Sequence, residues 1–394
     1  MPHRPSFESA TRHHSPSRSS PSAPRKSRGD RLADSYSDVP IVPLFGHDAL
    51  RRRLLAASRA GRLPSSLLLH GPAGVGKQRL ALWLARALLC EAADPPCGIC
   101  QGCRYADELS HPDLHWIFPR PRLKDSDPSL EEVRADHTDA IAERVASHGL
   151  YARPSGTEGI FVSAVRSIVH RSGISPALGR RKVFIVGDAE RMVPQEGADM
   201  AANAFLKLLE EPPADTTLIV TSSEPGALLP TIRSRVVAVR VPSLPDPDVL
   251  SFLAHPTVRA ALDGASVPKS DPDRAQFADG APGALLSGDD RLQARETATR
   301  LLAAAESGDR AVALRISFAQ GATKARGRFS DTLEALASLL HTRARASAER
   351  GDSRSAVAAA RSVESVQRAL EQAAGNVSPN LITASLLSEL GRRR

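Results

Sequence analysis

The 394-residue sequence lacks long apolar runs, which argues against a membrane-spanning protein. No run approaches the roughly 18 apolar residues that a membrane-spanning helix needs, and the polar start has no apolar signal core. Aromatic residues are also scarce: they make up 4% of the chain, although 41% of it is hydrophobic. The core must therefore consist mainly of Leu, Ala and Val, which favours packed helices. We expect a cytoplasmic, helix-rich protein of two or three domains.

Positive charge is modest and unevenly distributed. Of the net charge of +8, residues 1–38 contribute +3, from seven basic and four acidic side chains. This segment is rich in Ser, Pro and Arg without apolar periodicity, so it cannot repay the entropy of ordering. We expect a disordered tail over 1–38, which is either simply solvated or binds a partner. The charge left to the folded part is a weak argument for nucleic-acid binding.

Only four cysteines are present, and all fall between Cys90 and Cys103 in the pattern C-x6-C-x2-C-x2-C. In a reducing compartment this grouping favours a metal over disulfides. Each C-x2-C step lets two thiolates face one ion, and four thiolates make a closed tetrahedral zinc site of structural type. A buried Cys90 that is not a ligand, or redox-active thiols, are the alternatives, and His111 and His115 are more typical of strand-edge residues. The predicted zinc ligands are Cys90, Cys97, Cys100 and Cys103.

The segment GPAGVGKQ (71–78) matches the phosphate-binding pattern G-x-x-x-x-G-K-[ST] except at its last position. The apolar run SLLLH (66–70) precedes it and the helical pattern KQRLALWLARALLC (77–90) follows it. In such a loop, backbone amides, the lysine and the helix N-terminus attract phosphate. A chance Gly-rich turn would not explain the strand before the loop and the helix after it.

The catalytic parts that should accompany this loop are incomplete. Gln78 stands where a hydroxyl should bind magnesium. Asp188 follows the apolar run KVFIV (182–186), but Ala189 replaces the expected glutamate and Glu190 comes one residue too late to act as the base. The sequence therefore predicts a degenerate site, at which ATP and Mg²⁺ bind weakly or not at all. Its candidate residues are Gly71, Pro72, Gly74, Gly76, Lys77, Gln78 and Asp188.

Apolar, β-branched runs separated by helical stretches indicate a buried parallel sheet. Besides those already named, the runs are TLIVTS (217–222), VVAVRV (236–241) and the strand within HPDLHWIF (111–118). Residues 119–158 are Pro-rich and charged, and read as an insertion with one short helix. Strands vanish beyond Pro242, and amphipathic helices continue from Asp290 to the end.

Several motifs together carry a family resemblance. They are the loop with its helix ending in the cysteine knuckle, then HPD (111–113), NAFLKLLEEPP (203–213), TSSEP (221–225) and TIRSRV (231–236), with a fainter ADGAPGALL (278–286). In this combination, from about Val42 to Arg240, the chain resembles the bacterial clamp-loader branch of the AAA+ ATPases, and most closely its delta-prime subunits. On its own, NAFLKLLEEPP would also fit an ordinary amphipathic helix that ends at two prolines.

The resemblance implies a fold class and a division of the chain. The fold is an α/β, AAA+ P-loop NTPase-like parallel-sheet domain over 39–241, with a zinc knuckle at 90–103 and the insertion at 119–158. A small helical lid over 242–288 and an all-α collar over 289–394 follow.

The resemblance also implies a function. The chain would be a stator, with weak or absent ATPase activity, in a hetero-pentameric ring with gamma or tau and delta subunits that places the sliding clamp on primed DNA. Arg235 would be an arginine finger acting on a neighbour's ATP, with Arg233 in support; a surface arginine is the plain alternative. Gly283 stands where the lid's sensing arginine is expected. The alternatives are an active gamma/tau-type ATPase and a stand-alone zinc protein that binds nucleic acid.

Overall fold

The computed structural model describes residues 41–125, 127–154, 158–192, 199–319, 326–374 and 377–392. The predicted tail over 1–38 lies outside these residues. Among the described residues, no helix is both long and apolar enough to cross a membrane.

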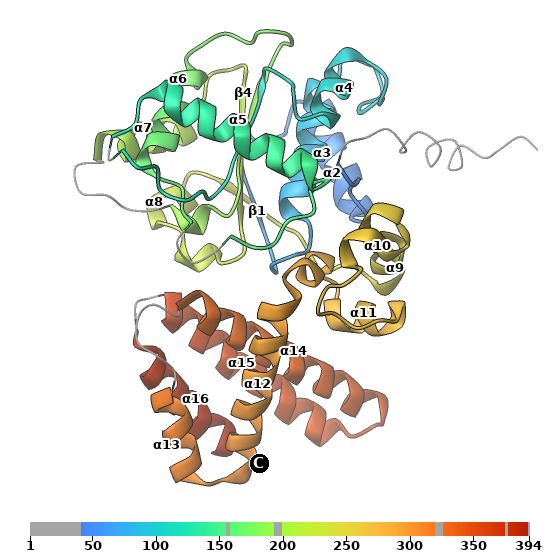
Figure 1. Ribbon diagram of the computed structural model, residues 1–394, viewed down its shortest axis with the longest axis vertical. Coiled ribbons are helices and arrows are strands. Elements are labelled where there is room, and N and C mark those ends of the chain that lie inside the picture. The colour runs from blue at the N-terminus through green and yellow to red at the C-terminus, as the bar shows by residue number, and fades with distance from the viewer. Residues whose placement is uncertain are drawn as a thin grey trace, which may run out of the picture. The chain divides into compact units, whose positions relative to one another are not determined.

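Five parallel strands form one sheet in the order β2-β3-β4-β1-β5 (Figure 1). The strands are β1 (Ser66–His70), β2 (Leu114–Ile117), β3 (Lys182–Val186), β4 (Thr216–Ser222) and β5 (Val237–Arg240). In the register, Leu68 of β1 stands opposite Val220 of β4 and Ala238 of β5. The predicted parallel sheet is thus confirmed, and the loop that follows β1 leaves the carboxyl edge of the sheet between β4 and the edge strand β5.

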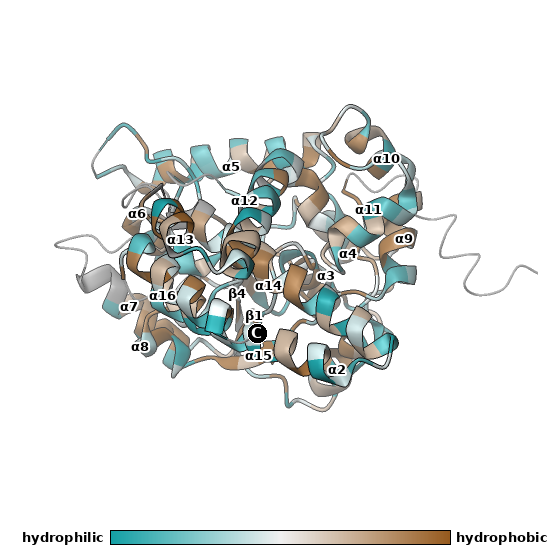
Figure 2. Cartoon of the chain, turned by 90° about the horizontal axis from the view of Figure 1, so that it is seen from below, coloured by the Kyte–Doolittle hydropathy of each residue, from teal (hydrophilic) through white to brown (hydrophobic). Residues whose placement is uncertain are grey.

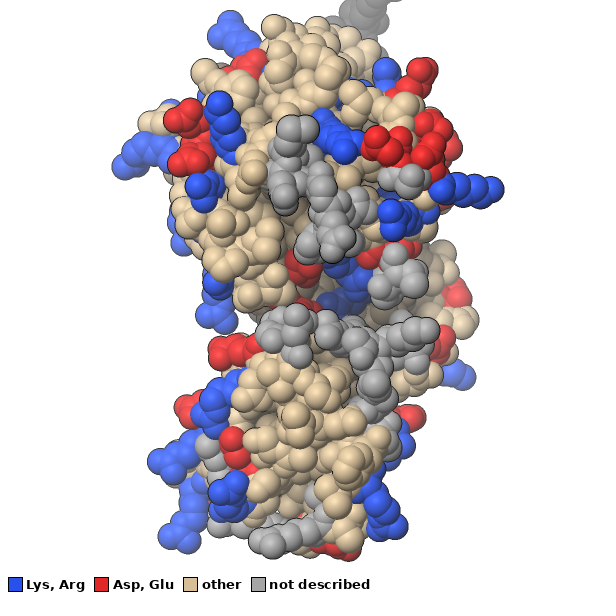
Figure 3. Space-filling model, turned by 90° about the vertical axis from the view of Figure 1, so that its left-hand side faces the viewer, with Lys and Arg blue, Asp and Glu red and all other residues tan. Residues whose placement is uncertain are grey.

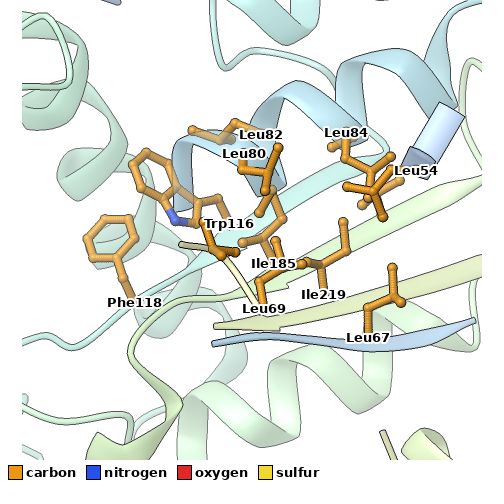
Figure 4. Packing of buried hydrophobic residues seen from close by; sticks show 14 of the residues in the cluster. Leu54, Leu67, Leu69, Leu80, Leu82, Leu84, Trp116, Phe118, Ile185 and Ile219 are labelled. Atoms are coloured by element: carbon orange, nitrogen blue, oxygen red, sulfur yellow. The ribbon is translucent and has the colours of Figure 1, made fainter. Parts of the chain in front are cut away.

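The sheet is covered on both faces, because side chains alternate along each strand. Leu67, Leu69, Ile185 and Ile219 pack on one face with Leu80 and Leu84 of helix α3 (Lys77–Leu89), as Figure 4 shows. Helix α2 (Asp48–Arg59) lies on this same face. The intervening residues of the strands pack on the other face against helices α6 (Val162–Ser172) and α7 (Asp199–Glu210).

Two details of this α/β region differ from the sequence-based expectation. The insertion holds a helix of 17 residues, α5 (Leu130–Ala146), and not a short one. A capping box begins it, since the Ser129 side chain and the Glu132 side chain each bond the other's backbone amide. Strand β5 is largely exposed, with Val237 50% accessible, because it is the edge of the sheet and not part of its buried centre.

The remaining elements before Pro242 are short. They are helix α4 (Gln101–Asp107), the 3-10 turns η2 (Ala189–Arg191) and η3 (Pro225–Ala227), and helix α8 (Pro230–Arg233). Helix α4 packs on α3.

Beyond Val241, the described residues contain helices and no strand. The predicted lid holds α9 (Asp246–Ala254), α10 (Pro256–Leu262), α11 (Asp271–Ala278) and η4 (Pro282–Ser287). The predicted collar holds α12 (Gly288–Ser307), α13 (Arg310–Ala319), α14 (Arg326–Glu349), α15 (Ser353–Ala374) and α16 (Pro379–Arg392). Each group has its own buried cluster, and α12 and α14 show a hydrophobic and a hydrophilic face in Figure 2. The all-helical C-terminal region is confirmed.

Candidate functional site

The Gly-rich loop joins β1 to α3, as the motif requires. Gly74 and Gly76 adopt φ values of +83° and +91°, which side-chain-bearing residues rarely take. Gly76 is the N-cap of α3, so the first helical residue is Lys77. The loop therefore keeps the backbone form of a phosphate cradle at a helix N-terminus.

The ammonium group of Lys77 is turned back onto its own loop. Its Nζ donates to the carbonyl oxygens of Gly71 (2.9 Å) and Pro72 (2.8 Å) and to Ser223 Oγ (2.9 Å). An ammonium has three protons, so these bonds use its full donor capacity. Burial lowers the pKa of Lys77, while the nearby carboxylates of Asp188 and Glu190 oppose that shift. A phosphate would have to compete with contacts that the protein already makes.

Gln78 occupies the position between the loop and the acidic strand end. Its Nε2 donates to Asp188 Oδ2 (2.9 Å), and its Oε1 accepts from Trp116 Nε1 (2.8 Å). The side chain is 8% exposed and lies close over Gly187, where an added Cβ would be 2.4 Å from Oε1. The Gln78 amide thus stands where the P-loop pattern has a hydroxyl, and it bonds both Asp188 and Trp116.

After Asp188, the side chain of Glu190 is directed into the protein interior. Ala189 is buried in η2, while Glu190 Oε1 accepts from the Ser223 amide (3.0 Å). Its other oxygen is buried with no hydrogen-bond partner among the described residues. Burial first, and the charge of Asp188 second, raise the pKa of Glu190. Glu190 therefore belongs to the wall of the cavity, a role that its place one residue after Ala189 did not predict.

The predicted lid touches the loop through a pair of glycines. The Gly283 amide donates to the Gly74 carbonyl oxygen (2.9 Å), and a Cβ on Gly283 would lie 3.0 Å from Gly74 Cα. A side chain at position 283 would therefore press against the backbone of the loop. The cavity left beside the loop measures about 160 Å³ and is lined by Lys77, Gln78, Asp188 and Glu190 among others.

The four cysteines come together at the other end of α3. Their sulfur atoms all lie within 4.8 Å of one another, and two of the pairs are 3.8 and 3.9 Å apart. Four thiolates at a zinc–sulfur distance of about 2.3 Å would stand roughly 3.8 Å apart around a tetrahedral ion. Cys90 is the C-cap of α3 and Cys100 the N-cap of α4, so the cluster joins the two helices. The set could hold a metal ion.

Backbone amides and an ion pair support this cluster. The amides of Cys97, Cys100 and Cys103 each donate to the sulfur of the preceding cysteine at 3.3–3.4 Å. Arg86 of α3 pairs with Asp107 of α4 at 2.9 Å. The arrangement suits four thiolates, which need donors and no acceptors around them.

The two nearby histidines do not join the cysteine cluster. His111 precedes β2, is 3% exposed, and its Nδ1 accepts from the Asp113 amide (3.0 Å). His115 lies in the edge strand β2, where burial, with a smaller contribution from Arg171, lowers its pKa to about 3. Both are structural residues in this arrangement.

The third residue of the HPD motif has a structural role. The Asp113 carboxylate accepts from the amides of Ala177 (2.6 Å), Leu178 (2.9 Å) and Gly179 (2.9 Å). Although burial opposes it, these three donors lower the pKa of Asp113. The motif therefore fixes the loop that leads from α6 to β3.

Arg235 lies between α8 and β5, away from the residues that line the cavity. Its Nε donates to Glu210 Oε2 (3.0 Å), and Nη1 donates to the Thr231 carbonyl oxygen (3.0 Å). The side chain is 29% exposed, so it is available at the surface. Arg233 is exposed at the end of α8.

The structure brings together Lys77, Gln78 and Asp188 beside the predicted loop, and it brings the four predicted cysteines together in a separate cluster. Sequence reasoning missed Trp116 and Ser223, which hold Gln78 and Lys77 respectively. Ser223 lies within the TSSEP motif, so its place just after β4 was a usable signal. Nothing near Trp116 in the sequence connects it to Gln78, 38 residues away.

A parallel sheet with a Gly-rich loop that joins β1 to the N-terminus of α3 defines a P-loop-like α/β protein. Comparison with known proteins specifies the family. A family model described as DNA polymerase III, delta subunit, matches residues 46–245, just over half of the chain. The chain belongs to this family.

Individual relatives agree with this assignment. The chain is 30% identical over 264 residues to DNA polymerase III subunit delta' of Escherichia coli, covering 65% of each chain. It is 35% identical over 177 residues to the delta' subunit of Pseudomonas aeruginosa, covering 44% of this chain and 42% of the relative. It is also 30% identical over 226 residues to DNA polymerase III subunit gamma/tau of Mycobacterium tuberculosis, covering 57% and 32%. The chain therefore spans less than two thirds of the length of these relatives.

Proposed function

We propose that the chain is a delta-prime-type subunit of a bacterial clamp loader, working in the cytoplasm. It would sit in a ring with gamma or tau and delta subunits and help to place a sliding clamp on primed DNA. The family assignment and the similarity to delta' subunits support this proposal. The divisions at 39–241, 242–288 and 289–394 would correspond to its AAA+ module, lid and collar.

In this role the subunit does not hydrolyse ATP itself. One observation carries the proposal: the Gln78 amide bonds Asp188 where a magnesium ion would need both a hydroxyl and a free carboxylate. Ala189 supplies no base beside it. Any ATP or Mg²⁺ bound at this loop would therefore be held weakly and would remain intact.

Two further sites belong to the proposal. The four cysteines hold one structural zinc ion, because their number and spacing match a closed thiolate site. Arg235 acts on the neighbouring subunit's ATP, since an arginine supplied in trans stabilises charge on the γ-phosphate.

On the face in Figure 3, basic and acidic side chains are interspersed among the described residues. This face therefore does not offer the continuous basic stripe that stand-alone binding to phosphates would use.

Reconstitution tests the function directly. The full chain is mixed with gamma or tau and delta subunits, and clamp loading on primed DNA is compared with and without it. We expect a stable complex and loading that depends on this chain. Failure to enter the complex would refute the proposal.

A second measurement separates a stator from a working ATPase. ATP turnover by the isolated wild-type chain is compared with Lys77→Ala, and we expect both at background. Turnover by the wild type at a rate typical of active loaders, abolished by Lys77→Ala, would identify an active gamma/tau-type subunit instead.

A further inference from the structure

A segment of the insertion forms part of the wall of the nucleotide cavity. Residues 147–154, which we call the strap, follow α5 directly. Residues 149–154 of the strap line the same 160 Å³ cavity as the Gly-rich loop and η4. The strap is therefore far in sequence from the loop and next to it in space.

The first half of the strap is bonded to the helix that starts at the loop. Arg79, two residues after Lys77, donates from Nη2 to the carbonyl oxygens of His148 and Gly149, both at 3.1 Å. The Val42 amide also donates to the His148 oxygen, at 2.9 Å. These bonds hold the strap backbone against Arg79, the third residue of α3.

Gly149 is where this contact is tightest. Its φ is +64°, and a Cβ added there would lie 2.3 Å from Arg79 Nη2. No other residue fits at this point without moving either the strap or the arginine.

Tyr151 links the strap to the residues that occupy the metal position. The Arg144 guanidinium lies 3.1 Å from the centre of the Tyr151 ring. The Trp116 ring, whose nitrogen holds Gln78, is 6.0 Å from it, centre to centre. The Tyr151 ring thus lies next to the Trp116 ring that bonds Gln78.

The last part of the strap is bonded to η4 and to α14. The Arg153 amide donates to Ser287 Oγ at the end of η4 (3.1 Å). Its guanidinium pairs with Asp331 and, at 3.8 Å, with Glu334 of α14. The strap is therefore bonded to both the loop helix and the segment that covers the loop.

The space that remains is too small for a nucleotide. Pockets for ligands of that size measure about 300–1,000 Å³, and the cavity beside the loop measures about 160 Å³. From these contacts we infer that the strap is an internal occupant of the nucleotide site, and that a nucleoside diphosphate or triphosphate binds only when the strap is displaced. This inference depends on the loop being a nucleotide site and not on membership of a clamp loader, so the two can fail separately.

With occlusion of this kind, the apparent affinity for the nucleotide is proportional to the fraction of molecules in which the strap is displaced. The apparent dissociation constant equals the intrinsic one divided by that fraction. A change that loosens the strap without touching the loop should therefore tighten nucleotide binding, although it adds no contact to the nucleotide.

The chain offers a matched pair of glycines for this test. Gly149→Ala would place a methyl group against Arg79, whereas Gly61→Ala introduces the same backbone strain, at φ +63°, with nothing within 4 Å of the new Cβ. Binding of fluorescent N-methylanthraniloyl-ADP to the full chain is measured for the wild type and both variants. We expect Gly149→Ala to bind at least about tenfold more tightly, and Gly61→Ala to match the wild type.

Two additional variants keep the result decisive. Adding Lys77→Ala to Gly149→Ala should remove the gain, which places the ligand at the loop. If Gly149→Ala does not fold, Tyr151→Ala replaces it, since it removes the ring that packs on Trp116. Binding by the folded strap variant within twofold of the wild type, or a gain that survives Lys77→Ala, would overturn the inference.

Discussion

Helix α3 carries a different kind of site at each of its ends. At the N-terminal end, Lys77 and Gln78 bond to Gly71, Ser223 and Asp188, so their polar groups are satisfied by the protein itself. At the C-terminal end, the Cys90 sulfur lies within 4.8 Å of three other sulfurs and accepts a hydrogen bond from the Cys97 amide. A site whose groups bond to one another needs no ligand to be stable. A cluster of four thiolates does need one, because buried negative charges repel unless an ion lies between them.

The largest expected effect comes from disrupting the four-cysteine cluster at the C-terminal end of α3. Cys100→Ser should lose the zinc ion and lower the thermal unfolding midpoint, because structural zinc contributes binding free energy on the order of 10 kcal/mol. Zinc content by elemental analysis and the midpoint are measured together. Ile99→Ser is the control, since Ile99 lies between two ligands but is 81% exposed.

Wild-type protein that contains no zinc under reducing, chelator-free conditions would contradict this prediction. So would a Cys100→Ser variant with an unchanged midpoint. In either case the two ends of α3 would be alike, with both satisfied by the protein alone.

A second prediction concerns Arg235, which lies at neither end of α3 but between α8 and β5. In the reconstituted ring, Arg235→Ala should reduce DNA-stimulated ATP hydrolysis by a factor on the order of 10³, the usual value of an arginine finger. The isolated fold should be unchanged, because Arg235 is bonded only to surface groups such as Glu210. Arg233→Ala, at the neighbouring exposed arginine, should have a smaller effect. Full ATPase activity in the Arg235→Ala ring would exclude a role in trans.

Sequence patterns predicted the features that depend on neighbouring residues. The cysteine cluster follows from spacings of three and seven residues, and β3 follows from an unbroken apolar run that a doubly covered parallel strand requires. Helix α5 was underestimated because its flanks are rich in proline and charge, although Ser129 and Glu132 show the capping-box spacing.

Features that depend on distant contacts could not be read from the sequence. The substitution at Gln78 was visible, but its partner Trp116 arises from the alignment of β2 beside β3, which no local pattern encodes. The same holds for the strap. The roles of Gly149 and Tyr151 depend on their contacts with Arg79 and Trp116, which are distant in sequence.

A third prediction tests whether the N-terminal end of α3 is stabilised by its own contacts. Gln78→Leu removes the acceptor of Trp116 Nε1 and the donor to Asp188, leaving a buried donor unsatisfied. The expected loss is about 1–3 kcal/mol of stability, measured as a lower denaturation midpoint. Gln101→Leu is the matched control, because Gln101 is exposed on α4 and bonds only Tyr105. Equal midpoints for the two variants would show that the Gln78 contacts do not matter for stability.

The smallest expected effect concerns the acids that surround the same end of α3. The pKa of Glu224 is raised to about 7, mainly by burial and then by the nearby charges of Glu334 and Glu190. Asp331 adds to this shift, and Arg153 opposes it. An unfolded glutamate titrates near its ordinary value of about 4.5. The folded state therefore keeps a proton that the unfolded state releases, and stability is full below about pH 4.5 and falls as the pH rises toward 7.

The dependence should amount to about 1 kcal/mol after allowance for solvent screening. Thermal midpoints at pH 5.5 and pH 8 are compared for the wild type, Glu224→Gln and Glu211→Gln. Glu224→Gln keeps the shape of the neutral acid and should lose part of the pH dependence, while Glu211→Gln, at an exposed residue, should retain it. If all three proteins show the same pH dependence, the carboxylates beside the loop are ionised and solvated, and the N-terminal end of α3 is more open to water than its contacts indicate.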